Sequence, residues 1–327
     1  MRTRAKLLVL AISCMAAACS PAANIELARQ DDPKPPEQPD QPDGDGGIGG
    51  TGLFGTVTAL GSVMLNGLNV QIEPITSIRQ DSMLEVGATL LIEARAGANG
   101  YVADRIAAYY PLVGPIDRVD SGGQALSVLG TSVEIGPEVR VYDEAGEAID
   151  RQTLRPGDDV AISGIWRNRS VVATRIDRRP ADASAAVSGL LREDVRGVRI
   201  GATTLDPSCC LNLEAGQYVG FEGAYLEDVF VPTSRNVGAQ QLFSEGVREL
   251  VVEAYLARNP NDDGFHLSGF GIVMDPESPA TPAVDDRSLF IGSYDGEFRI
   301  ERSIILPSDQ TARAAMLDQL DVESLLP

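Results

Sequence analysis

The stretch GTSVEIGPEVRVYDEAGEAIDRQTLRPGDDVAISG, residues 130–164, contains the pattern that decides the fold of this chain. Apolar and polar residues alternate around Val133 and again before Ile162, and glycines stand at the corners, at Gly130 and Gly157. Alternation with a period of two is typical of a β-strand with one buried face. Glycine allows the backbone conformations and close approaches by which a short sheet curves. The stretch therefore predicts short antiparallel strands in a small, curved sheet.

The same pattern occurs four times after residue 52, although not at a fixed period. Each copy opens with a strand in which a small residue lies two positions before an apolar one: Gly55-Thr-Val57, Gly114-Pro-Ile116, Gly189-Leu-Leu191 and, more loosely, Ala254-Tyr-Leu256. A turn of identical spacing follows in all four: Leu65 to Val70, Val128 to Val133, Ile200 to Leu205 and Leu267 to Ile272. Three copies then have an L-x-x-G step before the next strand: Leu84 to Gly87, Leu154 to Gly157 and Leu213 to Gly216. The fourth keeps only Leu289-x-Ile291, so it is degenerate.

This repetition predicts an all-β protein of tandem small five-stranded, OB-like barrels, in about four copies. We expect a signal peptide over 1–18, a flexible Pro/Asp/Gly-rich tether over 19–52, barrel repeats over 53–110, 111–180, 181–238 and 239–306, and a C-terminal helical tail over 307–327. Units of roughly sixty residues are only marginally stable alone, so neighbouring units should pack together. In the tail, Met316, Leu317 and Leu320 have helical spacing after a possible cap at Ser308, and we expect this helix to dock on the last barrel.

The quoted stretch, with GGIGGTG at residues 46–52 and the G-x-[VI] strand after it, resembles a bacterial family known as domain of unknown function 5666. The second copy is the most similar, the first and third are looser, and the resemblance covers most of residues 47–236. It implies an exported protein of small β-barrels. It implies no activity, so we assign no catalytic residue from it.

The N-terminus joins a basic start to an apolar run too short to span a bilayer comfortably, which is the layout of a secretory signal. The run ends in Ala16-Ala-Ala-Cys19-Ser20, which resembles the lipobox of bacterial lipoproteins with Ala16 where Leu is usual. The resemblance implies lipidation of Cys19, with Cys14 as a weaker candidate, and Ser20 implies the periplasmic side of the outer membrane. The alternative is an ordinary cleaved signal and release into the periplasm.

The glycines that end the tether match a nucleotide-binding fingerprint, because Gly47, Gly49 and Gly52 have G-x-G-x-x-G spacing. That fingerprint functions between a strand and a helix. Here a run rich in Pro and Asp precedes it and a strand-like segment follows. We therefore interpret these glycines as the flexible end of the tether, and we predict no cofactor.

The charge of the chain argues against polyanionic partners. The formal net charge is −20, and removal of residues 1–18 with their three positive charges leaves −23. A negative field repels nucleic acid and anionic lipid surfaces, so we predict no nucleic-acid partner. The only lysines are Lys6 and Lys34, which excludes Schiff-base and Walker-lysine chemistry from the body.

His266 is the only histidine and would have to serve any histidine-based triad. Strand alternation places His266 and Ser268 on one face, but residues two apart on a strand are not arranged as nucleophile and base. We interpret His266 as a solvent-facing strand residue.

Cys209 and Cys210 are adjacent, in a compartment that favours oxidation. They are a candidate disulfide, and a vicinal bond, a free buried pair, a bond between chains and a redox switch are all open. Structural roles are favoured because no C-x-x-C spacing is present.

Two further motifs have an alternative explanation as structural elements. Asn259–Gly264 fits the opening of a calcium loop, but Phe270 stands where the bidentate glutamate is needed, so a hairpin turn is favoured and no metal site is predicted. Trp166, the single tryptophan, is either a surface anchor for a partner or, as we favour, an aromatic packed in a turn.

These observations favour a lipid-anchored envelope protein that is not an enzyme and that binds a protein or an oligosaccharide. The alternatives are a carboxylate-dependent envelope hydrolase and a calcium-dependent glycan-binding module, with a purely structural spacer third. No pair of carboxylates can be named as catalytic, because their separation depends on the fold.

Overall fold

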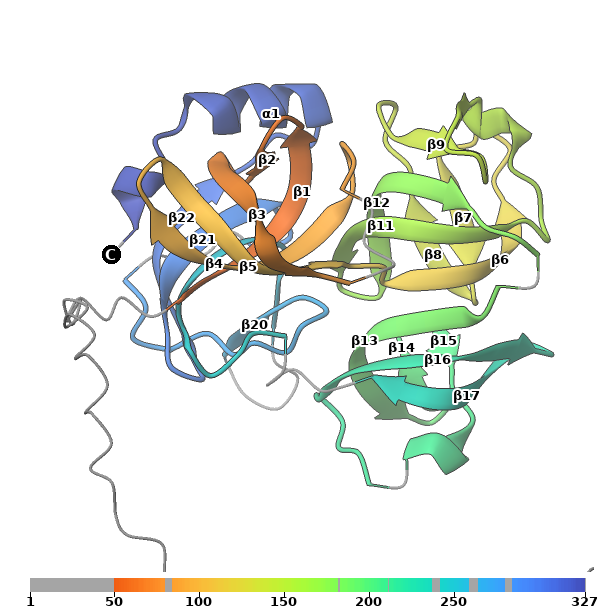
Figure 1. Cartoon of the computed structure of the whole chain (residues 1–327). Coiled ribbons are helices and arrows are strands. Elements are labelled where there is room, and N and C mark those ends of the chain that lie inside the picture. The colour runs from red at the N-terminus through yellow and green to blue at the C-terminus, as the bar shows by residue number, and fades with distance from the viewer. Residues whose placement is uncertain are drawn as a thin grey trace, which may run out of the picture. The chain divides into compact units, whose positions relative to one another are not determined.

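The computed structural model of the chain describes residues 50–79, 84–181, 183–210, 212–236, 242–258, 264–279 and 284–326. The chain divides into residues 1–47 and residues 48–327, and the described residues all belong to the second part. The signal peptide, Cys19 and the tether up to residue 49 therefore lie outside them. Strands dominate the described part (Figure 1), and none of its helices is long and apolar enough to cross a membrane.

The first copy is a closed barrel of five strands in the order β1-β2-β3-β5-β4, with β4 returning to β1. Its strands are β1 (Gly50–Ala59), β2 (Val63–Leu65), β3 (Leu68–Ile78), β4 (Thr89–Gly97) and β5 (Gly100–Ala108). The β3–β5 pair is parallel and the other pairs within this barrel are antiparallel. The barrel begins at Gly50, before the expected boundary, and Gly52 lies inside β1. A Cβ on Gly52 would come within 2.7 Å of Phe243 and Leu250, so this glycine serves packing.

The second copy repeats this order as β6-β7-β8-β12-β11 and is closed by the β11–β6 pair. Its elements are β6 (Leu112–Val119), β7 (Ala125–Val128), β8 (Thr131–Glu134), β9 (Arg140–Tyr142), β10 (Ala148–Ile149), a 3-10 helix (Arg151–Thr153), β11 (Asp159–Arg167) and β12 (Ser170–Arg178). The long connection from β8 to β11 supplies β9, which pairs parallel with β12.

The third copy has the same strand order but is closed only by an isolated parallel bridge between Leu205 and Phe230. Its elements are β13 (Ala185–Asp194), β14 (Gly197–Ile200), β15 (Thr203–Thr204), a 3-10 helix (Pro207–Cys210), β16 (Tyr218–Leu226) and β17 (Val229–Asn236).

The fourth copy is the degenerate one. Its first strand is interrupted at Tyr255, and isolated bridges, His266 to Val273 and Met274 to Phe298, complete the ring. Its elements are β18 (Val247–Ala254), β19 (Leu256–Arg258), β20 (Phe265–Leu267), β21 (Ser288–Tyr294) and β22 (Phe298–Ile305), followed by α1 (Gln310–Gln319) and a 3-10 helix (Glu323–Leu325). The expected architecture of tandem small barrels is thus confirmed, with two closed barrels.

Hydrogen bonds join the two sequence signatures of each regular copy. The L-x-x-G glycine donates its N–H to the carbonyl of the third residue of the opening motif, at 2.8–2.9 Å: Gly87 to Val57, Gly157 to Ile116 and Gly216 to Leu191. These glycines have φ values of +88°, +92° and +93°. Only glycine adopts such values without strain, so the motif fixes the loop that starts the fourth strand.

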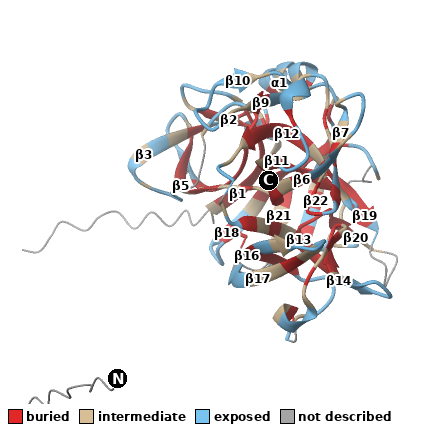
Figure 2. Cartoon of the chain, turned by 90° about the vertical axis from the view of Figure 1, so that its right-hand side faces the viewer, coloured by how far each residue is buried: buried red, intermediate tan, exposed pale blue. Residues whose placement is uncertain are grey.

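Copies also pair with one another. The first and fourth share a sheet through the parallel β1–β18 pair, in which Leu53 faces Val251. The second and third share a sheet through the antiparallel β6–β13 pair, where Val113 faces Ala186. Buried residues follow the strands of every copy (Figure 2) and form two clusters rather than four. Packing between copies therefore supplies the core that a single unit lacks.

Helix α1 differs from expectation in its cap and its docking site. Asp309, not Ser308, caps it, and its carboxylate accepts the N–H of Ala312. Leu317 is buried in the cluster of the first barrel, and its carbonyl lies over Gly67. The helix therefore docks on the first copy as well as the last. The β1–β18 pairing places these two copies in one sheet, which chain order does not reveal.

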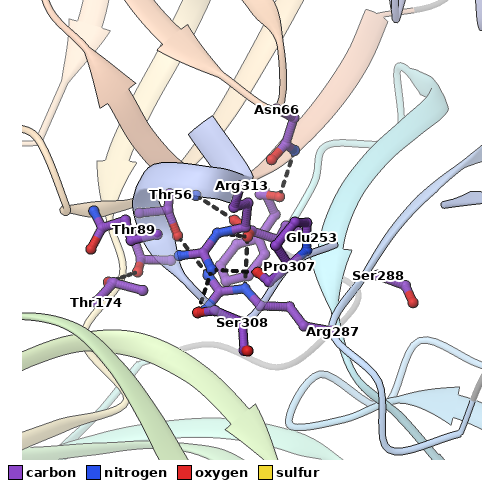
Figure 3. A network of polar contacts seen from close by, with 12 residues as sticks. Thr56, Asn66, Thr89, Thr174, Glu253, Arg287, Ser288, Pro307, Ser308 and Arg313 are labelled. Atoms are coloured by element: carbon purple, nitrogen blue, oxygen red, sulfur yellow. Dashed lines mark hydrogen bonds and ion pairs between the residues drawn. The ribbon is translucent and has the colours of Figure 1, made fainter. Parts of the chain in front are cut away.

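A buried ion cluster holds this arrangement together (Figure 3). The Glu253 carboxylate, fully buried on β18, accepts hydrogen bonds from Arg287 Nε at 2.7 Å and from the Thr56 N–H at 2.9 Å. Arg313 Nε of α1 lies 3.1 Å from the same carboxylate. Nη1 of the Arg313 guanidinium donates to the Pro307 carbonyl at 3.0 Å. The Glu253 side chain thus links the first copy, the fourth copy and the helix.

Candidate functional site

The expectation for His266 is wrong. It lies on β20, is only 7% exposed and pairs in register with Ala257 of β19. Ser268, also buried, accepts the Asn168 N–H of the second copy at 2.9 Å. Strand alternation correctly gives a shared face, but it cannot tell that another copy covers that face.

Trp166 is not a surface anchor. It is 1% exposed, and its indole N–H donates to the Ser188 carbonyl at 2.9 Å. A Cβ on Gly201 would lie 2.6 Å from its ring, and a Cβ on Gly269 would come still closer to it. Turns of the third and fourth copies thus close on a tryptophan of the second, which confirms its interpretation as an aromatic packed against turns.

The structure joins Cys209 and Cys210 in a disulfide at the end of the 3-10 helix Pro207–Cys210. Cys210 is buried in the shared core and Cys209 packs against it. Of the four open alternatives, this is the vicinal bond. The calcium-like loop lies outside the described residues except for Gly264, and no cluster of three or more metal-ligating side chains occurs in the described ranges.

A groove of about 520 Å³ lies among the first three copies, and we call it the junction groove. The linker from the first to the second copy contributes Tyr109 and Tyr110, and the linker from the second to the third contributes Arg179 and Ser184. Leu242, which precedes β18, also lines it. The segments that join the barrels thus line this groove together with residues of β4, β5, β6, β13 and β16.

Hydrogen bonds of Ser188, on β13, hold the first linker against the third copy. Its N–H donates to the Pro111 carbonyl at 3.0 Å, and its hydroxyl donates to the Tyr110 carbonyl at 3.1 Å. Its own carbonyl accepts the Trp166 indole N–H. The first linker therefore has a fixed position against β13.

Three arginines and one glutamate are the charged groups among the described lining residues: Arg79, Arg105, Arg179 and Glu222. Arg105 is engaged, because its guanidinium donates to Glu93 at 2.6 Å and to the Leu242 carbonyl at 2.7 Å. Arg179 differs, because its Nε is buried and has no hydrogen-bond partner among the described residues. The junction groove is locally positive on a chain whose net charge is −20.

Two buried tyrosines form the aromatic wall of the junction groove. Burial raises the pKa of Tyr218 to about 12, although the nearby Ser188 and Tyr109 hydroxyls and the charge of Arg79 oppose the increase. Burial also raises the pKa of Tyr109 well above its ordinary value. Both rings pack on Phe270 of the fourth copy, with centroids 5.3 and 6.1 Å away. At neutral pH both phenols are protonated, and the Tyr109 hydroxyl is inaccessible to solvent, with no hydrogen-bond partner among the described residues.

Sequence reasoning did not find this groove. Its residues come partly from the linkers and partly from strands of three copies, which meet only in the folded chain. The sequence offered one signal for the groove: two of the chain's 8 tyrosines, Tyr109 and Tyr110, are adjacent at the junction of two copies. Arginine and tyrosine in neighbouring linkers are typical of binding surfaces.

The fold and the groove together define a class: tandem OB-type barrels with a basic, tyrosine-containing groove where the linkers meet the strands. Residues 54–107 and 113–177 match the family model described as Domain of unknown function (DUF5666), and these segments make up most of the first two barrels. The match ends at residue 177, short of the resemblance up to residue 236, although the third copy has the same strand order. No curated protein and no solved structure matches the chain.

Proposed function

We propose that this chain is an exported, lipid-anchored envelope protein, on the periplasmic side of the outer membrane, that binds an oligosaccharide in the junction groove and catalyses no reaction. The observation that carries the proposal is the groove itself. Its volume of about 520 Å³ is in the usual range for small-ligand sites. Arginine and protonated tyrosine donors suit a hydroxyl-rich ligand, and OB-type barrels commonly bind oligosaccharides or nucleic acids. The net charge of −20 disfavours the nucleic acid.

The composition of the groove supports binding over hydrolysis. Two-carboxylate glycoside hydrolysis needs an acid and a base or nucleophile. Glu222 is the sole carboxylate among the described residues that line the groove, and no histidine or cysteine accompanies it there. We therefore keep the alternative of a carboxylate-dependent hydrolase second.

The proposal of an anchor rests on the sequence around Cys19 and the Pro/Asp/Gly-rich segment after it. A single acyl chain binds membranes weakly, whereas the multiply acylated cysteine of a bacterial lipoprotein would hold the body firmly. The tether would then let the barrels move some distance from the membrane.

Photocrosslinking in intact cells tests the binding role. A photoreactive amino acid replaces Tyr110, which is half-buried in the groove, and the matched control replaces Tyr225, which is half-buried on β16 and outside the groove. We expect position 110, and not position 225, to capture a saccharide that glycan staining and mass spectrometry detect. Capture of a single protein from position 110 would show that the ligand of the groove is a protein and not an oligosaccharide. Equal capture from both positions, or none, would contradict the role of the groove.

A further inference from the structure

We infer that the junction groove is specific for a saccharide that bears a carboxylate, and that Arg179 is the residue that binds this carboxylate. The inference rests on the proposed function and names the ligand class of the same site.

The state of Arg179 is the first argument. Its backbone N–H is used within the fold, donating to the Asp159 carbonyl at 2.8 Å. Its Nε is inaccessible to solvent and has no hydrogen-bond partner among the described residues, although the residue lines the groove. A buried guanidinium N–H without a partner is costly, and a carboxylate in the groove would satisfy it once the side chain turns this N–H toward the groove. Guanidinium and carboxylate groups fit each other through two parallel hydrogen bonds.

The neighbouring arginine shows what a satisfied guanidinium looks like in this groove. Glu93 holds Arg105 at 2.6 Å, and Glu93 in turn accepts the Ser244 N–H at 2.6 Å. Arg105 is therefore committed to the wall of the groove. Arg179 has no such carboxylate in the described part, so the ligand would supply it.

The negative charge of the protein favours a ligand that carries little negative charge of its own. A phosphate monoester carries about −1.5 to −2 at neutral pH, whereas a carboxylate carries −1. The body is strongly acidic and Glu222 lines the same groove, so repulsion rises with ligand charge. One carboxylate on an otherwise uncharged saccharide matches one available arginine.

Calorimetry on the full-length lipid-anchored protein in detergent tests the inference with two matched pairs of probes. The first pair is galacturonate, which carries a single carboxylate, and its methyl ester. The second is the disaccharide of N-acetylglucosamine and N-acetylmuramic acid, with chitobiose as the neutral partner. We expect at least one acid to bind about tenfold to a hundredfold more tightly than its neutral partner.

The variant Arg179→Gln should remove this preference, because it should weaken binding of the acid far more than binding of the neutral partner. Arg179→Lys should restore part of it, because lysine keeps the charge without the planar pair of donors. Arg248→Gln is the matched control, since Arg248 is exposed and outside the groove. The fluorescence of Trp166 checks that each variant is folded.

Three results would overturn the inference: no acid binds, acid and neutral partner bind equally, or Arg248→Gln reduces the preference as much as Arg179→Gln. If one of these occurs while position 110 still captures a saccharide in cells, the binding role stands and only the ligand class is wrong. If position 110 captures nothing, the proposed function fails as well.

Discussion

Replacing Glu253 with glutamine should lower the free energy of unfolding by about 3–5 kcal/mol. Glutamine keeps the shape of the side chain but removes the charge that faces Arg287 at 2.7 Å and Arg313 at 3.1 Å. All three side chains are at most 5% exposed, so water cannot replace the lost charge. Two buried guanidinium groups would then repel each other without compensation.

The variant Arg313→Met is the matched comparison. The cluster holds two arginines for one glutamate, and burial followed by the charge of Arg287 lowers the pKa of Arg313. Its removal therefore relieves repulsion as well as losing attraction to Glu253. It also frees the Pro307 and Ser308 carbonyls, which accept its hydrogen bonds at 3.0 and 3.2 Å. We expect a smaller loss of about 1–2 kcal/mol.

Urea unfolding at pH 7, followed by circular dichroism and by Trp166 fluorescence, measures both losses. With a slope of about 3 kcal/mol per molar urea, Glu253→Gln should move the midpoint down by about 1–1.7 M. The reasoning would be refuted by a Glu253→Gln protein within about 1 kcal/mol of wild type, or by one that is more stable than Arg313→Met.

The pH dependence gives a second measurement on Glu253. Burial raises its pKa, but Arg287, Arg313 and the hydrogen bonds from Arg287 and Thr56 outweigh burial, so the pKa is lower than in the unfolded chain. The charged form thus stabilises the fold above the unfolded pKa of about 4.3, and this contribution is lost as the pH falls through the lower folded value. The stability difference between wild type and Glu253→Gln should shrink in acid. A difference that stays constant from pH 7 to pH 3 would contradict this assignment.

Three further outcomes are expected. Gly269→Ala should cost about 2–5 kcal/mol, because φ is +84° and the new Cβ would lie 2.6 Å from Trp166 Cβ. The control Gly216→Ala has a φ of +93° and open space, so it should cost only about 1–2 kcal/mol in urea unfolding, and equal losses would show that the tryptophan contact is unimportant. Tyr218, with a pKa of about 12 when folded, should favour the fold below pH 10 and lose up to about 3 kcal/mol of that contribution between pH 10 and pH 12. Tyr218→Phe should remove one late step from the alkaline absorbance titration at about 295 nm, and an unchanged titration would place the raised pKa elsewhere. Cys19→Ser should release the protein from the membrane fraction on immunoblots, and its persistence there would exclude lipidation at Cys19.

The barrel copies could be predicted from sequence because their signatures are local. Gly87 and Gly157 need a positive φ, and each donates to the opening strand of its own copy. Such constraints leave a repeated mark in the sequence. The pairing of β1 with β18 leaves no repeated signature in the sequence, because the paired residues, such as Leu53 and Val251, are far apart along the chain. For that reason the contact of α1 with the first copy was not predicted. The burial of His266 was missed because alternation along one strand does not show what covers its face.

The family match covers only part of the junction groove, because Arg79, Leu91, Arg105, Ala107 and Val113 lie inside the matched segments. The matched segments, 54–107 and 113–177, leave out Tyr109 and Tyr110 between them and Arg179 and Tyr218 after them. The matched glycines are explained by barrel closure, because they hold loop and strand together within each copy. The linkers are bound by no such requirement, apart from the Ser188 hydrogen bonds that position the first of them. Ligand specificity in this architecture would therefore depend on the linkers, while the barrels keep them in place.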